Sequence, residues 1–339
     1  MINLVNKKIL YIAPKFFGYE ENIADQLVKL GADIDFLPDR LFDTPLMTAV
    51  TKVKREWIIP SINKAYREKL NEFSRTHYDV IFVVNGQTLS EEFLSELKQQ
   101  YKQATFILYM WDSLKNREST IKNLDFFDHC FSFDKNDATE FSMNFRPLFF
   151  SNGFEKSKSN ILNQHDISFI GTAHTDRYHI VKSITDSLPS STKKYWYLFL
   201  QAPWVFYYYK LTNSYYKKAN RDEFKYSSIT KKEVQDVFFS SRSILDIEHP
   251  NQTGLTIRTL ETLGSEKKLV TTNKNVKNYD FYVENNIFVI DRKNPVVPTE
   301  FINSPYTAIC EKTYQKYSIQ GWLDEILLKS KIKDSKCSS

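Results

Sequence analysis

Residues 243–271 read SILDIEHPNQTGLTIRTLETLGSEKKLVT and decide the expected fold. The run Ser243–Ile247 has the apolar pattern of a buried strand, Leu255–Leu263 has helical spacing, and Lys268–Thr271 is again strand-like. A polar loop joins the first strand to the helix. This order is typical of a parallel α/β sheet, in which the carboxyl ends of the strands deliver polar residues to one edge.

The same alternation of strands and helices runs through both halves of the chain. In the N-terminal half, strand-like runs end at Ala13, Val84, Met110 and Phe133, with helical patterns between them. One of these helical patterns, Lys52–Thr76, contains Pro60, where we expect the helix to break.

A polar, irregular segment from Ser151 to His165 separates the two halves. A chain of 339 residues exceeds what one hydrophobic core usually supports. We therefore expect two Rossmann-like doubly wound α/β domains facing a cleft, at 1–155 and 156–310. A helix at 311–328 is expected to pack back toward the first domain, ahead of a disordered basic tail at 329–339.

Composition excludes several classes of protein. The net charge of +5 is small and dispersed, so no nucleic-acid groove is expected. Three cysteines without CxxC spacing indicate neither a disulfide framework nor a zinc knuckle. The N-terminus lacks the pattern of a signal peptide, and the longest apolar run, Tyr195–Tyr209, is interrupted by Gln201 and Pro203. We expect a cytoplasmic protein without a transmembrane helix.

The loop of the opening stretch has the chemistry of an anion site. A helix that begins after a strand presents unpaired N–H groups and the positive end of its dipole, which suit a diphosphate. Gly254 permits close approach, Arg258 adds a cation, and Glu261 can accept bonds from a ribose diol two turns into the helix. The expected nucleotide site comprises Gln252, Thr253, Gly254, Leu255, Thr256, Arg258 and Glu261. The alternative is an ordinary amphipathic helix, with Arg258 and Glu261 paired at i,i+3 on its surface.

The run DIEHPNQTGLTIRTLETLGSEKKLVTTN resembles the donor-binding segment of GT-B glycosyltransferases, specifically the CgeB-like group and relatives from lipopolysaccharide or capsule loci. The retaining families of this fold carry an E-x7-E pattern whose second Glu binds the ribose of the nucleotide. Glu261 matches that second carboxylate, whereas Thr253 stands at the position of the first. The resemblance covers about thirty residues.

A second, weaker resemblance covers Asp166–Thr172 and Arg177, which look like the first strand and loop of a GT-B C-terminal domain. It implies that this loop lies near the phosphates of the donor. Gly171, Thr172, His174 and Arg177 are therefore further candidate donor-binding residues. A loop histidine such as His174 is more often simply solvated.

The candidate acceptor residues lie where the strands of the N-terminal half end. Gly18, Tyr19, Asn85 and Gln87 are the expected acceptor-binding residues. Asp112 and Glu20 are the candidates for the carboxylate that takes the proton of the acceptor hydroxyl. Helix capping for Asp112 and a helix-dipole role for Glu20 are the alternatives.

Aromatic residues concentrate beside lysines in Tyr195–Tyr216, which reads YWYLFLQAPWVFYYYKLTNSYY. Tyr195–Leu200 has a strand pattern and is expected in the core. Trp204–Lys218 suits peripheral docking at a lipid headgroup layer on the cytoplasmic face of the membrane.

The resemblance and the residues together predict a glycosyltransferase. It would move a sugar from a nucleotide-sugar donor to a cell-surface glycan or lipid-linked glycan acceptor, as in lipopolysaccharide, O-antigen, capsule or exopolysaccharide synthesis. The sequence lacks HExxH and paired CxxC motifs, and its triplet Asp33-Ile34-Asp35 lies inside an expected strand, unlike the exposed DxD of metal-dependent GT-A enzymes. A metal-independent mechanism without a cofactor is therefore expected. Two alternatives remain open, a nucleotide-sugar epimerase on the same fold and a non-catalytic CgeB-like envelope maturation or glycan-binding protein.

Overall fold

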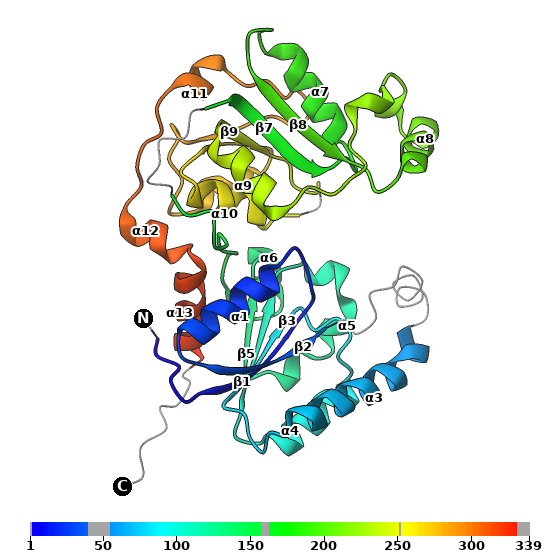
Figure 1. Ribbon diagram of the computed structural model, residues 1–339, viewed down its shortest axis with the longest axis vertical. Helices are drawn as coiled ribbons and strands as arrows, with labels where there is room; N and C mark the ends of the chain where they lie inside the picture. The colour runs from blue at the N-terminus through cyan, green and yellow to red at the C-terminus, as the bar shows by residue number, and fades with distance from the viewer. Residues whose placement is uncertain (1, 40–54, 157–162, 251, 331–339) are drawn as a thin grey trace. The chain divides into compact units, whose positions relative to one another are not determined.

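The computed structural model describes residues 2–39, 55–156, 163–250 and 252–330. The chain forms two compact units (Figure 1). The first comprises Met1–Leu148 and Ile319–Ser339, and the second comprises Phe149–Ser318. The division predicted at residues 155 and 156 thus falls inside the second unit.

The first unit is built on a six-stranded parallel sheet with the order β2-β1-β3-β4-β5-β6. Strand β1 pairs with β2 on one side and with β3 on the other. The loops that leave β1 and β3 therefore turn toward opposite faces of the sheet, which makes the crevice between them a topological switch point. The strands are β1 (Lys8–Ala13), β2 (Asp33–Pro38), β3 (Val80–Val84), β4 (Thr105–Met110), β5 (His129–Ser132) and β6 (Asn144–Phe145).

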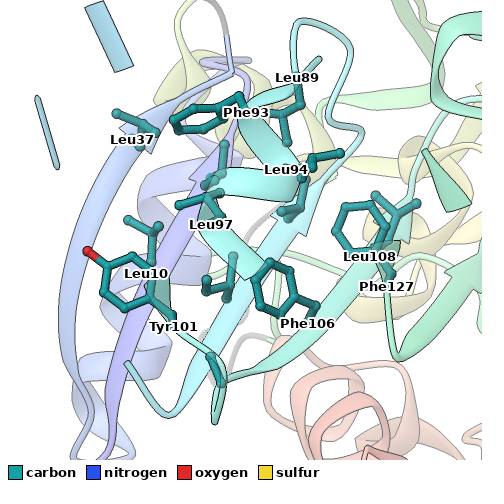
Figure 2. Packing of buried hydrophobic residues seen from close by; sticks show 14 of the residues in the cluster. Leu10, Leu37, Leu89, Phe93, Leu94, Leu97, Tyr101, Phe106, Leu108 and Phe127 are labelled. Carbon is teal, nitrogen blue, oxygen red and sulfur yellow. The ribbon is translucent and has the colours of Figure 1, made fainter. Parts of the chain in front are cut away.

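Helices cover both faces of this sheet (Figure 1). They are α1 (Tyr19–Lys29), α3 (Arg55–Phe73), α4 (Glu91–Gln100), α5 (Glu118–Ile121), α6 (Lys135–Glu140) and α13 (Ile319–Lys329), with short 3₁₀ turns at Leu114–Asn116 and Leu124–Phe126. The hydroxyl of Ser90 caps α4 by accepting from the N–H of Phe93 at 3.1 Å. Behind that cap, Phe93, Leu94 and Leu97 are buried against the sheet (Figure 2).

Pro60 lies inside α3, so the predicted break of this helix was wrong. A proline lacks one N–H and removes one hydrogen bond from the helix. Pro60 stands only in the second turn, and the helix continues past it to Phe73. Packing of Ile62, Tyr66 and Leu70 into the core of the first unit supports that continuation.

The C-terminal helical pattern is two helices, not one. Helix α12 (Glu311–Lys316) belongs to the second unit, and α13 belongs to the first. The predicted basic tail begins inside α13 at Lys329, and its residues from 331 onward lie outside the described part of the chain. Helix α13 lies beside α1 (Figure 1). Its Trp322 is buried against Phe82 and Tyr109 of the sheet.

The second unit has a five-stranded parallel sheet with the order β11-β10-β9-β7-β8. Its strands are β7 (His165–Thr172), β8 (Lys194–Phe199), β9 (Ser241–Asp246), β10 (Lys268–Thr271) and β11 (Ile287–Val289). Its helices are α7 (Arg177–Ser187), α8 (Pro203–Thr212), α9 (Lys231–Phe239), α10 (Ile257–Gly264), α11 (Thr299–Asn303) and α12, with 3₁₀ turns at Ser214–Tyr216, Arg221–Glu223 and Lys274–Asn278. The expectation of two Rossmann-like α/β sheets is confirmed.

Candidate functional site

The topology of the second unit places its switch point between β7 and β9. Strand β7 is followed along the chain by β8 on one side, and the chain then returns to form β9 on the other side. The loops after β7 and β9 therefore flank one crevice at the carboxyl edge of this sheet. These two loops carry most of the residues predicted to bind a nucleotide.

Arg177, the first residue of α7, spans this crevice. Its Nε donates to the carbonyl of Ile247 at 2.8 Å, and its Nη1 donates to the carbonyl of Thr172 at 3.2 Å. Among the described residues, no carboxylate forms an ion pair with it. Burial lowers the pKa of Arg177. The nearby carboxylates of Asp246 and Glu248 raise it and the guanidiniums of Arg258 and Arg292 lower it, yet an arginine keeps its charge. Within the described part of the chain, the switch point thus holds a cation that no carboxylate contacts directly.

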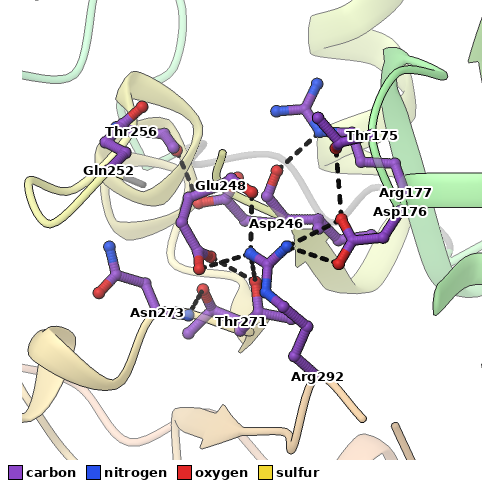
Figure 3. A network of polar contacts seen from close by, with 12 residues as sticks. Thr175, Asp176, Arg177, Asp246, Glu248, Gln252, Thr256, Thr271, Asn273 and Arg292 are labelled. Atoms are coloured by element: carbon purple, nitrogen blue, oxygen red, sulfur yellow. Dashed lines mark hydrogen bonds and ion pairs between the residues drawn. The ribbon is translucent and has the colours of Figure 1, made fainter. Parts of the chain in front are cut away.

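Arg292, which follows β11, organises the neighbouring loops (Figure 3). Its Nη1 donates to both carboxylate oxygens of Asp176 at 2.8 Å, and its Nη2 donates to Oε1 of Glu248 at 2.6 Å. Glu248 also accepts from the hydroxyl of Thr272. This ion-pair network ties the loops after β7, β9, β10 and β11 together, although only the loops after β7 and β9 were predicted to bind the donor. Sequence reasoning missed Arg292 because 116 residues separate it from Asp176.

Asp246, the last residue of β9, fixes the start of α10. One of its oxygens accepts from the hydroxyls of Thr256 and Thr259, each at 2.6 Å. The hydroxyl of Thr256 in turn accepts from the N–H of Thr259 at 3.2 Å, so Thr256 is the N-cap of α10. The helix begins at Ile257, two residues later than its sequence predicts, and the Thr256 hydroxyl is already engaged.

Two asparagines after β10 hold the loop in front of α10. Nδ2 of Asn275 donates to the carbonyl of Thr253 at 3.0 Å, and Nδ2 of Asn273 donates to the carbonyl of Gly254 at 3.3 Å. In a trans peptide the N–H points opposite to the carbonyl. The N–H of Leu255 is therefore directed away from Asn273. Gln252 reinforces the same turn by donating from Nε2 to the carbonyl of Gly254 at 3.0 Å.

Arg258 and Glu261 form the i,i+3 pair that the alternative interpretation of this helix predicted. Nη1 of Arg258 lies 3.2 Å from Oε2 of Glu261. The pair is not on the surface, because the side chain of Glu261 is only 1% exposed. The hydroxyl of Ser151 also donates to Glu261, at 3.4 Å. The guanidinium of Arg258 lies 5.2 Å from the ring centre of Phe238.

His174 stands in the loop after β7, next to Gly171 and Thr172, which end the strand. Burial, helped by the charges of Arg177 and His249, lowers the pKa of His174 to about 4. The ring of His249, from the loop after β9, lies 6.2 Å from that of His174. His174 is therefore neutral near pH 7, so it can donate or accept a hydrogen bond there without adding a charge.

In the first unit, the ends of β3 and β4 bring Asn85 and Asp112 together. Nδ2 of Asn85 donates to Oδ2 of Asp112 at 3.1 Å, and Oδ1 of Asn85 accepts from the N–H of Trp111 at 3.2 Å. Arg117 forms an ion pair with Asp112 at 2.7 Å. The side chain of Asp112 is still 41% exposed, so a ligand can reach it. Asp134, which follows β5, caps α6 by accepting from the N–H of Asn136 at 2.8 Å.

The loop after β1 ends at Gly18, and Tyr19 and Glu20 are the first residues of α1. Gly18 is the N-cap of α1 with a φ of 73°, a left-handed conformation that favours glycine. Glu20 is buried and accepts from the N–H of Phe16 at 2.9 Å. The ring of Phe16, half exposed, lies 6.3 Å from that of Trp111 and so links the loops after β1 and β4. These aromatic rings were missed as acceptor candidates.

Asp39, at the end of β2, holds the loop after β3. Its two carboxylate oxygens accept from the N–H groups of Gln87 and Thr88 at 2.8 and 3.0 Å. The loop begins with Asn85 and Gly86, both with φ near 63°. Gln87 therefore contributes its backbone to the support of the loop, while its side chain remains half-buried.

The described part of the chain contains no group of three or more His, Cys, Asp or Glu side chains placed to hold a metal. Among its helices, none is long and apolar enough to cross a bilayer.

Comparison with solved structures identifies the architecture. HepE from Anabaena, solved with UDP and glucose, aligns with a TM-score of 0.56 and 10% identity over 96% of this chain and 99% of its own. The same protein solved with UDP-glucose aligns with a TM-score of 0.55 and 11% identity over 95% of this chain and 98% of its own. AviGT4, a glycosyltransferase involved in avilamycin A biosynthesis, aligns with a TM-score of 0.53 and 10% identity over 96% of this chain and 97% of its own.

The chain has the GT-B fold. At 10% to 11% identity the likeness defines the fold and leaves the activity open. No protein-family model matches the chain, and a search of curated protein sequences finds no match either.

Proposed function

We propose that the second unit binds the diphosphate of a nucleotide-sugar at the crevice between β7 and β9. The observation that carries the proposal is Arg177, a cation without a carboxylate partner among the described residues. Two of its nitrogens are fixed by the carbonyls of Thr172 and Ile247. A phosphate oxygen can bond to the remaining nitrogen without breaking an ion pair, and Arg–phosphate contacts are among the strongest hydrogen bonds.

The neighbouring groups suit the same ligand. The loop that Asn273 and Asn275 hold leads into the start of α10, where backbone N–H groups and the helix dipole favour an anion. Arg258 lies nearby as a second cation, positioned by Glu261. A ribose contact by Glu261 stays a prediction and requires the pair with Arg258 to open.

The reaction we propose is transfer of the sugar to a glycan acceptor of the cell surface. The acceptor oxygen forms a bond with the anomeric carbon as the bond from that carbon to the diphosphate breaks. Arg177 would stabilise the charge on the leaving diphosphate, so catalysis rests on positioning and electrostatics. HepE was solved with UDP and with UDP-glucose, which supports a UDP-sugar as the donor class.

We further propose that the first unit binds the acceptor at the ends of β1, β3 and β4. Asp112 is the stronger candidate for the base that takes the acceptor proton, because its side chain is 41% exposed whereas Glu20 is buried. Phe16 and Trp111 supply aromatic rings beside it, against which a sugar ring can pack.

The test is binding of UDP and UDP-sugars to Arg177→Ala, measured by calorimetry. Loss of one charge-assisted contact predicts a dissociation constant about 10- to 100-fold higher. Arg242→Ala is the matched control. Arg242 belongs to the same unit but is the second residue of β9, near the amino ends of the strands and away from the crevice, where it pairs with Asp166 at 3.4 Å. Equal affinity of both variants for UDP-sugars would exclude this site.

The reaction type has its own test. If the protein converts a UDP-sugar to its epimer without an acceptor, the chain is an epimerase and the proposed sugar transfer is wrong.

A further inference from the structure

Helix α8 follows the edge strand β8 and is anchored to the second unit by one face (Figure 1). Val205 and Phe206 on that face are buried in the core of the unit. The ring of Phe206 lies 5.5 Å from that of Phe224, and Tyr209 lies 5.1 Å from the buried Tyr216. These contacts fix which side of α8 faces outward.

The outward side is apolar as well. We call it the α8 face, and it consists of five large side chains with their exposed fractions: Trp204 (67%), Tyr207 (53%), Tyr208 (54%), Leu211 (86%) and Tyr215 (47%). The four on the helix have the spacing i, i+3, i+4 and i+7, which puts them on one stripe. A surface helix normally carries polar residues on its outward side. A contiguous exposed apolar stripe marks a contact with a membrane or another molecule.

The charged residues in the α8 segment itself are all basic. Residues 204–221 contain no Asp or Glu and four cations, Lys210, Lys217, Lys218 and Arg221, whereas Asp222 and Glu223 come directly after them. Lys217 and Lys218 are exposed directly after Tyr215 and Tyr216, and neither forms an ion pair with any described residue. Lys210 lies on α8 itself, where its Nζ donates to the carbonyl of Ala219 at 3.2 Å.

We propose that the α8 face docks on an anionic lipid bilayer. Trp and Tyr side chains favour the interface between headgroups and acyl chains, and lysines beside them meet the lipid phosphates. A helix of ten residues is too short to span a bilayer and lies along its surface. A second copy of the chain is the weaker occupant, because a two-fold contact through this face would bring like-charged lysines together.

This inference is independent of the proposed sugar transfer, since vesicle binding is measured without any donor. The probe is co-sedimentation with vesicles of phosphatidylcholine alone and of phosphatidylcholine containing roughly one-third phosphatidylglycerol. The protein should pellet with the anionic vesicles and not with the neutral ones. Its binding should weaken as salt is raised, because salt screens the lysines.

Two variants and their controls separate the apolar and the charged contribution. Leu211→Asp should weaken binding to anionic vesicles roughly tenfold or more, whereas Val296→Asp, at a position that is 48% exposed in the same unit, should not. Lys217→Glu combined with Lys218→Glu should weaken it by roughly 30-fold. The control is Lys231→Glu combined with Lys232→Glu, a lysine pair at the start of α9.

Trp204 reports whether the α8 face itself meets the lipid. Brominated lipids in the anionic vesicles should quench the fluorescence of the wild type, and Trp204→Phe should still pellet but lose most of this quenching. The proposal is overturned if the α8 variants pellet like their controls, or if Trp204→Phe leaves the quenching unchanged. It is also overturned if Leu211→Asp turns a dimer into a monomer in sedimentation while vesicle binding stays the same. Unchanged UDP-sugar binding in these variants keeps the two proposals distinguishable.

Discussion

Arg177 and Arg258 lie near each other but differ in their partners, since Arg258 forms an ion pair and Arg177 donates to backbone carbonyls. Arg258 pairs with the buried carboxylate of Glu261, and separating that pair would leave a buried charge without a partner. Among the residues that the structure describes, Arg177 is held by the carbonyls of Thr172 and Ile247 and forms no ion pair. A phosphate that binds Arg177 therefore gains an ionic contact without breaking another. At the scale of single residues, Arg177 is the better phosphate ligand and Arg258 the better fixed charge.

The titration of His174 gives a prediction at the same scale. Burial lowers its pKa in the folded protein to about 4, from an ordinary value of 6.5. Between these two values the unfolded chain binds a proton that the folded chain does not. The free energy of unfolding should therefore rise as pH increases from about 4 to about 6.5, and this contribution should be constant above that window.

Urea unfolding at a series of pH values measures this effect. His174→Gln should flatten the pH dependence in that window, whereas His77→Gln, at an exposed position of the first unit, should leave it as in the wild type. If both variants retain the full slope, His174 does not have the lowered pKa that its surroundings indicate.

At the scale of elements, α10 is positioned by contacts that its sequence pattern shows only in part. The apolar spacing of Leu255–Leu263 predicts the helix, and the structure has it at Ile257–Gly264. The start of the helix was predicted two residues too early. Thr256 is the N-cap because its hydroxyl is held by the carboxylate of Asp246, ten residues earlier in the chain. Gly264 ends the helix in close contact with the segment that begins the second unit. A Cβ atom there would lie 2.5 Å from Cγ of Phe150 and 2.6 Å from the carbonyl oxygen of Phe154.

Gly264→Ala should therefore destabilise the protein. In an open helix alanine is more favourable than glycine by about 1 kcal/mol. Here the clash with a backbone carbonyl cannot be relieved by a side-chain rotation, and overpacking of this kind costs about 1–3 kcal/mol. We expect a lower midpoint of thermal unfolding for Gly264→Ala and a still lower one for Gly264→Val. A midpoint at or above that of the wild type for Gly264→Ala would show that α10 is not packed this closely.

At the scale of the whole molecule, local patterns predicted the two parallel sheets but not the contacts that assemble each edge. An apolar run such as Val80–Val84 is a strand because both faces of a parallel sheet are buried. The role of Arg292 could not be predicted from the residues beside it in the sequence, because its partners Asp176 and Glu248 lie in loops far away along the chain. The composition of Trp204–Lys218 was enough to predict an aromatic segment that suits a lipid surface. Only the structure shows that Val205 and Phe206 of this segment are buried and do not belong to the exposed α8 face.

The chain passes from the second unit back into the first, where α13 completes the core. Trp322 is fully buried, with its ring 4.7 Å from that of Tyr109 and 6.0 Å from that of Phe82. Because these strands belong to the sheet of the first unit, removal of the indole should loosen that unit selectively. Trp322→Ala should lower its free energy of unfolding by about 3–5 kcal/mol.

Hydrogen exchange resolved by peptide measures that selectivity. Amides of β1, β3 and β4 should exchange faster in Trp322→Ala, while those of β7 and β9 keep their protection, since the second unit has its own sheet and core. Trp204→Ala is the matched control, the same substitution at a residue that is 67% exposed. It should leave both units as they are. Equal loss of protection in both units of Trp322→Ala would mean that the two unfold as one, and that α13 stabilises the whole chain and not the first unit alone.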